Sequence, residues 1–290
     1  MARGRLVNGI LFCILCVIWG SSFILMKEGM KQLSAYQVAT IRMLSAGLVL
    51  LPVAVRQFKK IPSGKLGYVA LSGVLGSFFP AFLFCLAETK IDSSLAGFLN
   101  SLTPVFTIVT GLLFFRQVFQ LHKLIGVLIA ITGMVLLLLA QGAVNMQYMS
   151  YAWFVLAATI MYGFNINLVS RHLSQTGSLA VVAVSFALLL GPCLLILFAT
   201  GYFELPLTRG NVFLSTGASA VLGIMGTVVA TVIFYRLINR AGGLFASMVT
   251  YGVPFVALFW GVVAGERINV WQVLGLAVIL CGVYITGSRK

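Results

Sequence analysis

The sequence predicts an all-α membrane protein of ten transmembrane helices, arranged as two inverted five-helix repeats. Apolar stretches of about 20 residues follow one another along the whole chain, and about 20 helical residues cross a hydrocarbon core of about 30 Å. Hydrophobic residues make up 61% of the chain and charged residues only 8%, whereas an ordinary globular domain has about 25% charged residues. The third observation is that the second half of the sequence repeats the first.

The predicted spans follow the apolar runs in order. They cover residues 7–26, 35–55, 66–87, 93–115, 124–141, 148–170, 178–200, 212–235, 243–264 and 270–287. The first run follows two arginines, as a secretory signal does. It is about 20 residues long, has no convincing cleavage site and precedes nine further spans, so we predict a retained helix.

The basic residues are divided unevenly between the predicted loops. If the amino end is cytoplasmic, thirteen of the 19 lysines and arginines fall in cytoplasmic segments, five fall in the opposite loops, and Arg42 falls inside the second span. All five acidic residues fall on the outer side. The positive-inside bias therefore predicts both termini in the cytoplasm, with a bacterial inner membrane as the expected location. It also explains the net charge of +14 without a nucleic-acid partner.

The two halves of the sequence resemble each other. The segment SSLAGFLNSLTPVFTIVTGLLFF matches GGLFASMVTYGVPFVALFWGVVAG, with Pro104 opposite Pro254. WGSSF, which begins at Trp19, matches YGFNI, which begins at Tyr162, more weakly. The helix after each proline-containing span carries two glycines seven residues apart, which predicts that these two helices pack together as a less mobile support.

The repeat also predicts the topology. Because each unit has five helices and five is odd, the second unit must enter the membrane upside down relative to the first. We predict units at residues 1–143 and 144–290, a construction found in many secondary transporters, whose binding site lies near the bilayer midplane. Since one chain supplies both halves, a monomer is preferred to a dimer.

The order of these features resembles the EamA-type transporters of the drug/metabolite transporter superfamily. The resemblance rests on the S-L-x-P and Y-x-V-P centres, the G-E-R turn at residues 265–267 and the glycine-spaced last helix, and it covers essentially the whole chain. It implies a multi-pass carrier that moves a small organic solute by alternating access. The chain departs from the family where Arg116 replaces the usual Glu after the fourth span, whereas the second copy keeps Glu266.

The two prolines lie near the predicted bilayer centre. A proline cannot bond to the carbonyl four residues back, which frees the carbonyls of Asn100 and Thr250. Free acceptors at this depth are tolerated where protein or a water-filled cavity satisfies them, so we predict a polar pocket with Pro104 and Pro254 as hinges. The side chains predicted to line this pocket near the two prolines are Asn100, Ser101, Thr103, Thr250 and Tyr251. The alternative interpretation is a pair of packing kinks.

Further solute-binding candidates come from other spans. The first and sixth spans supply Trp19, Ser22, Tyr162 and Asn165. Asparagine in hydrocarbon needs a partner, so Asn165 is expected to face other helices or the cavity. Small residues such as Ser22 suit close helix packing equally well. In the third span Phe78 is a candidate wall for an apolar solute, with ordinary packing as the alternative.

Arg42 is the only charged side chain predicted to lie well inside a span, about 10 Å from the outer boundary at 1.5 Å per residue. An ionisable residue at such depth is a functional hypothesis by default, and arginine binds a carboxylate or phosphate bidentately. The alternative is a structural arginine bonded to helix-end carbonyls or to Glu28.

The predicted absences narrow the function. A proton-coupled exporter of organic cations needs a carboxylate inside the membrane, and no acidic residue of this chain is predicted there. Such an exporter is therefore kept only as an alternative. Two distant histidines and a lone C-x-x-C give no catalytic site, metal site or cofactor, so an enzyme is not expected. We therefore predict an exporter, exchanger or facilitator for a neutral, zwitterionic or weakly anionic metabolite, amino acids being the first choice. A membrane protein with a structural or regulatory role and no transport is the other alternative.

Overall fold

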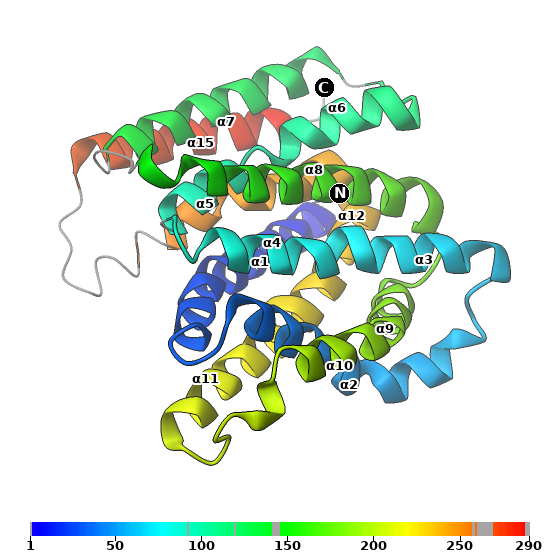
Figure 1. The fold of residues 1–290 in the computed structure, drawn as a ribbon. Coiled ribbons are helices and arrows are strands. Elements are labelled where there is room, and N and C mark those ends of the chain that lie inside the picture. Colours follow the sequence, from blue (N-terminus) through cyan, green and yellow to red (C-terminus); the bar gives the residue numbers. More distant parts are fainter. Residues whose placement is uncertain are drawn as a thin grey trace.

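A computed structural model describes residues 2–91, 93–118, 120–140, 146–256, 259 and 269–287. This part of the chain is helical and contains no strand (Figure 1). Seven helical segments are long and apolar enough to cross a membrane: Gly4–Gly29, Ala35–Phe58, Ser63–Ala87, Leu95–Phe115, Ala152–Leu173, Ser178–Ala199 and Gly210–Ala241. Three apolar segments are shorter: Leu121–Leu137, Gly243–Val256 and Val270–Thr286.

Each predicted span overlaps one of these segments. The eighth was predicted too short, because its helix continues to Ala241, and the end of the ninth lies outside the described residues. The α-helices are α1 (Ala2–Gly29), α2 (Ala35–Phe58), α3 (Leu66–Gly73), α4 (Phe79–Ala87), α5 (Ser93–Asn100), α6 (Thr103–Phe115), α7 (Leu121–Ala140), α8 (Ala152–Leu168), α9 (Ser178–Leu188), α10 (Leu190–Ala199), α11 (Gly210–Val221), α12 (Ala230–Ala241), α13 (Gly243–Ser247) and α15 (Val270–Gly287).

Short non-α segments interrupt several of these helices. π-helical turns join α3 to α4, follow α8, and join α11 to α12, and single π-helical turns are often found at functional sites. They are η2 (Val74–Phe78), η4 (Val169–Leu173) and η6 (Leu222–Val229). Short 3₁₀ turns are η1 (Ser63–Lys65), η3 (Met146–Tyr151), η5 (Tyr202–Glu204) and η7 (Met248–Tyr251).

A capping box begins α2. The Ser34 hydroxyl accepts a hydrogen bond from the Gln37 amide at 3.2 Å, and the Gln37 side chain accepts one from the Ser34 amide at 2.9 Å. This reciprocal pair satisfies backbone donors that the first helical turn leaves open. The Gln37 side chain also donates to the Thr200 carbonyl at 2.9 Å, which ties the start of α2 to the end of α10.

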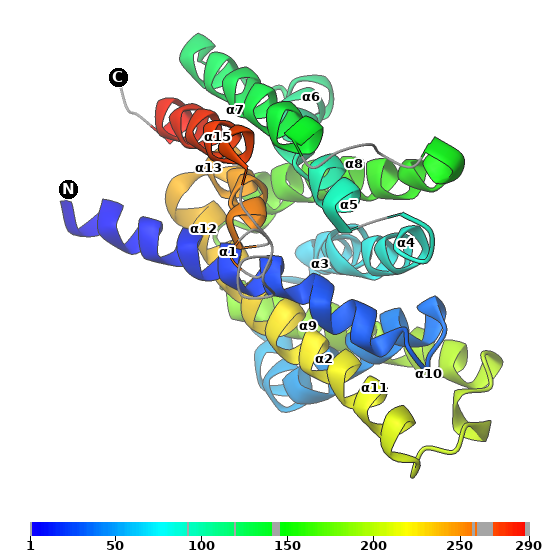
Figure 2. The same ribbon diagram turned by 90° about the vertical axis from the view of Figure 1, so that its left-hand side faces the viewer.

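The glycine-spaced helices α7 and α15 lie side by side at one edge of the bundle (Figures 1 and 2). A Cβ atom on Gly282 would lie 2.5 Å from the Gly126 carbonyl oxygen, and one on Gly133 would lie 2.7 Å from the Gly275 carbonyl oxygen. Small residues let helix backbones approach this closely in a membrane, where lipid tails are as apolar as leucine. The predicted packing of these two helices is confirmed.

Helices α6 and α8 also approach closely. A Cβ atom on Gly163 would lie 2.6 Å from the Phe106 carbonyl carbon. The Asn167 amide nitrogen, buried between the helices, donates to the Thr107 carbonyl at 2.7 Å and to the Thr110 hydroxyl at 2.9 Å. Asn167 therefore serves to join two helices.

The start of α1 and the end of α15 lie near each other in both views (Figures 1 and 2). An even number of crossings brings two chain ends to one side of a membrane. Which side faces the cytoplasm stays a prediction from the charge distribution.

Candidate functional site

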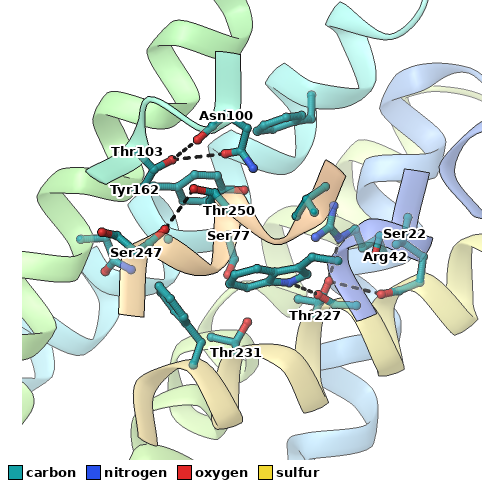
Figure 3. Close-up of a pocket in the computed structure, with 18 of the residues that line it drawn as sticks. Ser22, Arg42, Ser77, Asn100, Thr103, Tyr162, Thr227, Thr231, Ser247 and Thr250 are labelled. Atoms are coloured by element: carbon teal, nitrogen blue, oxygen red, sulfur yellow. Dashed lines mark hydrogen bonds between the residues drawn. The ribbon is translucent and has the colours of Figure 1, made fainter. Parts of the chain in front are cut away.

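A cavity of about 100 Å³ lies between the helices near the middle of the bundle (Figure 3). This space holds several water molecules or part of a small solute. The residues around it are Trp19, Ser22, Phe23, Met26, Arg42, Gly76, Ser77, Phe84, Asn100, Thr103, Tyr162, Asn165, Ile166, Leu222, Gly226, Thr227, Thr231, Phe234, Tyr235, Ser247, Thr250 and Val253.

Eight of the eleven predicted solute-binding residues lie around this cavity. They are Trp19, Ser22, Arg42, Asn100, Thr103, Tyr162, Asn165 and Thr250. The polar side chains gather in two groups, one around Asn100 and Thr250 and one around Arg42 and Thr227 (Figure 3). Contact with a solute stays a prediction for all of them.

Three predicted residues lie outside the cavity. Ser101 is fully buried, and its hydroxyl donates back to the Phe98 carbonyl at 2.5 Å. Tyr251 faces α7 within an apolar cluster, where its hydroxyl lies 3.5 Å from the Val127 carbonyl oxygen. Phe78 packs its ring against Phe79 and Phe82, with ring centroids 5.5 and 5.0 Å away. These three side chains therefore pack against neighbouring residues outside the cavity.

The two prolines mark breaks in their helices. The α5 helix ends at Asn100, and Pro104 lies in the first turn of α6, so the predicted span is two shorter helices. The Thr103 hydroxyl donates to the freed Asn100 carbonyl at 2.6 Å. In the other half α13 tightens into η7 before Pro254, and the Thr250 hydroxyl donates to the Ser247 carbonyl at 3.0 Å. Hydroxyl groups thus bond to backbone acceptors beside the cavity.

The π-helical segment η6 shapes the opposite wall. The Trp19 indole N–H donates to the Gly226 carbonyl at 3.1 Å, and its ring meets Phe234 edge-on with centroids 5.0 Å apart. A Cβ atom on Gly226 would lie 2.7 Å from the Ser22 hydroxyl oxygen. Glycine at this position therefore lets α1 approach η6, and Ser22 donates to its own helix, at the Ile18 carbonyl, at 2.8 Å.

Arg42 is the only charged side chain among the residues that line the cavity. Its Nε donates to the Thr227 hydroxyl at 2.6 Å, which fixes the guanidinium beside η6. The predicted alternative of a bond to Glu28 is not found within the described residues, where the Glu28 carboxylate pairs with Lys31 at 2.6 Å. An anchored guanidinium at the edge of an aromatic and hydroxyl-lined space suits an anionic group on a solute.

Asn165 is a lining residue with a buried acceptor. Its amide nitrogen donates to the Tyr235 hydroxyl at 3.0 Å, and its side chain is only 2% exposed. The amide oxygen has no hydrogen-bond partner within the described part of the chain. Because an unsatisfied buried acceptor costs about 1–3 kcal/mol, a water molecule or a donor group of a solute would stabilise this side chain.

Most of the cavity comes from matching positions in the two halves. Five pairs of lining residues are 150 residues apart, the same spacing as Pro104 and Pro254. These pairs are Gly76 and Gly226, Ser77 and Thr227, Phe84 and Phe234, Asn100 and Thr250, and Thr103 and Val253. Three further pairs, 143 residues apart, are Trp19 and Tyr162, Ser22 and Asn165, and Phe23 and Ile166. The first spacing, when applied to the third and eighth spans, indicates four further lining residues that were not among the predicted ones: Gly76, Ser77, Gly226 and Thr227.

No metal site is formed by the described residues, since no three His, Cys, Asp or Glu side chains come together there. In the C-x-x-C segment Cys13 is exposed, whereas Cys16 is buried with its sulfur 3.6 Å from the Val249 carbonyl oxygen. The two thiols therefore lie in different environments.

Glu88 follows its predicted span as expected, but it is buried. It follows α4 at the edge of its span and is only 8% exposed. Its Oε2 accepts a hydrogen bond from Ser93 at 3.3 Å, whereas its Oε1 has no partner within the described residues. The turn after α4 is packed, because Ala87 and Ile91 are buried. Burial raises the pKa of the Glu88 carboxyl from 4.5 to about 8, against the opposing effects of Lys27, the Ser93 hydrogen bond and Arg42.

We expect Glu88→Gln to stabilise the protein above about pH 8. A carboxyl whose pKa is higher in the folded state binds more protons when folded, so the stability of the wild-type protein falls as the pH rises from 4.5 to about 8. Glutamine does not titrate. The difference in melting temperature between variant and wild type should therefore be positive at pH 8.5 and vanish towards pH 4.5, whereas exposed Glu204→Gln should show no such trend. A lower melting temperature of Glu88→Gln at pH 8.5 would contradict this, since it would indicate an ionised Glu88 that stabilises Lys27 and Arg42.

A bundle of apolar, membrane-length helices around a small cavity with polar and aromatic lining residues defines a multi-pass membrane protein with an internal space between its helices. The model of the EamA-like transporter family matches the chain twice, over residues 7–139 and 149–288. The chain belongs to this family and is a transporter.

Individual relatives agree with this assignment. An uncharacterized transporter of Archaeoglobus fulgidus is 26% identical and is matched over 97% of this chain and 99% of its own length. A Salmonella typhimurium protein named a probable amino-acid metabolite efflux pump is 25% identical, with 96% of this chain and 94% of that protein covered. A crystal structure with 16% sequence identity covers 96% of both chains with a TM-score of 0.68, which shows a similar fold.

Proposed function

We propose that the chain is a secondary transporter for amino acids or similar carboxylate-bearing metabolites, with the cavity around Arg42 as the binding site. The observation that carries this proposal is the lining, in which one anchored guanidinium faces hydroxyl, amide and aromatic groups. An amino acid has a carboxylate for Arg42 and an ammonium group for the Asn165 amide oxygen. The Salmonella relative named as an amino-acid metabolite efflux pump supports the same substrate class.

The proposed mechanism is alternating access between two inverted five-helix units, residues 1–143 and 144–290. The double match of the family model and the paired lining residues support such units. Binding between two equivalent halves lets a rocking movement expose the same site to either side in turn. The close glycine contacts of α7 and α15 support the proposal that this pair is the less mobile part.

The lining also weighs against the organic-cation alternative. A cationic solute needs a carboxylate within the site, but the charged group in this lining is an arginine. We therefore propose export, exchange or facilitated movement of a zwitterionic or weakly anionic solute through a functional monomer.

Exchange in proteoliposomes tests the proposal. Liposomes loaded with an unlabelled mixture of amino acids should take up one or more labelled neutral or acidic amino acids when they contain the purified protein, and protein-free liposomes should not. Rapid filtration measures this uptake. Absence of exchange for every amino acid, together with uptake of labelled tetraphenylphosphonium driven by a pH gradient, would overturn the proposal in favour of a cation exporter.

A further inference from the structure

A second hollow, which we call the basic groove, lies at one end of the bundle, away from the central cavity. It has a volume of about 450 Å³ and is formed where α3 begins and where α6 and α8 end. These helix ends lie together at the right of Figure 1. Its lining includes Tyr68, Leu71, Phe114, Arg116, Arg171 and His172.

Two exposed arginines give the basic groove its charge. A guanidinium nitrogen of Arg171 donates to the Phe115 carbonyl, which holds this side chain against the end of α6. Arg116 ends α6 with φ of 50°, in the left-handed region where glycine is usual. An arginine that occupies such a backbone position at a conformational cost points to a use for its side chain.

The rest of the basic groove is aromatic and apolar. The His172 ring stacks on Tyr68 with centroids 4.3 Å apart and planes 7° apart. Leu71 and Phe114 form a wall on α3 and α6, and their side chains are 38% and 66% exposed. Both helices belong to membrane-length segments, so in the predicted topology this exposed wall faces the hydrocarbon, while the arginines lie at or just after the helix ends.

Charge and apolar surface together select the ligand. A soluble anion would use the arginines but leave the wall uncovered, and a zwitterionic lipid would cover the wall but add no net negative charge. An anionic phospholipid supplies a phosphate for the two guanidinium groups and an acyl chain for Leu71 and Phe114.

The second copy of the repeat lacks the arginine of the basic groove. The position 150 residues after Arg116 is Glu266 in the sequence, so the second half carries the opposite charge there. In the predicted topology Arg116 lies on the cytoplasmic side, where the membrane surface is negative. We propose that the basic groove binds the headgroup and the upper acyl chain of an anionic phospholipid, independently of which solute the central cavity carries.

Lipid titration of the delipidated protein in detergent tests this proposal. Native mass spectrometry should show preferential binding of dioleoyl phosphatidylglycerol over dioleoyl phosphatidylcholine from an equal mixture. The double variant Arg116→Gln and Arg171→Gln should bind phosphatidylglycerol roughly 10- to 30-fold more weakly, because each basic residue near a headgroup contributes about one kcal/mol. The matched control is Arg56→Gln with Lys60→Gln, two exposed cations on the same predicted side, and it should keep wild-type affinity.

Three outcomes would overturn the proposal. Equal binding of the two lipids by the wild-type protein would show an apolar contact without headgroup recognition, and this measurement decides the matter even if the double variant fails to fold. Displacement of phosphatidylglycerol by millimolar inorganic phosphate would indicate a site for free anions. An equal loss of affinity in the control variant would indicate general surface charge.

Discussion

Replacing Gly282 by leucine is expected to lower the free energy of unfolding by about 3 kcal/mol, at the upper end of overpacking costs. A Cβ atom at this position would lie 2.5 Å from both the Gly126 carbonyl oxygen and the Ala130 amide nitrogen. Backbone atoms cannot yield as a flexible side chain does, so α7 and α15 must separate and lose their mutual contact along several turns.

Thermal unfolding in detergent measures this effect. A loss of about 3 kcal/mol corresponds to a fall in Tm of roughly 6–12 °C, and size-exclusion chromatography should show loss of the monodisperse peak. Gly9→Leu is the control, because a Cβ atom at Gly9 in α1 meets nothing within 4 Å. Equal Tm values for the two variants would show that α7 and α15 do not depend on their glycine contact.

The helices and much of the cavity could be predicted because both depend on patterns that can be read along the sequence. Apolar length identifies segments that enter the membrane. The repeat then identifies equivalent positions in the two halves that meet near the centre of the protein. Two such pairs, Asn100 with Thr250 and Trp19 with Tyr162, line the cavity. These pairs were found from spacing and residue type, without knowledge of how the helices are rotated.

The misplaced residues depend on helix rotation and packing, which apolar length does not encode. A membrane helix presents apolar side chains both to lipid and to its neighbours, so hydropathy hardly indicates which face turns inwards. In the third span the π-helical turn η2 shifts the register, so that Gly76 and Ser77 line the cavity whereas Phe78 packs against neighbouring rings. Glu88 was placed on a loop because it follows an apolar run, but the tight turn after α4 buries it.

Arg42→Gln is expected to slow the exchange of amino acids by roughly 10- to 150-fold, because loss of a charge-assisted hydrogen bond costs about 1.5–3 kcal/mol. The substitution keeps a polar side chain in the cavity but removes the positive charge. In the exchange assay, an amino acid and its carboxamide, which keeps the ammonium group but has an uncharged amide in place of the carboxylate, should separate the roles of Arg42. Only the acid gives Arg42 a carboxylate to bind. The carboxamide should therefore exchange at similar rates with wild-type protein and variant. Arg56→Gln, an exposed change on the same helix, should leave both rates unchanged.

Thr227→Val separates anchoring from binding. This variant keeps the guanidinium but removes the hydroxyl that accepts from Arg42 Nε at 2.6 Å. A less fixed guanidinium still attracts a carboxylate but loses part of its orientation, so exchange of the acid should fall less than in Arg42→Gln. If Arg42→Gln instead slowed the acid and the carboxamide equally and lowered Tm, Arg42 would act by holding α2 against η6. The selective loss of the acid therefore distinguishes a guanidinium that binds the solute from one that only joins two helices.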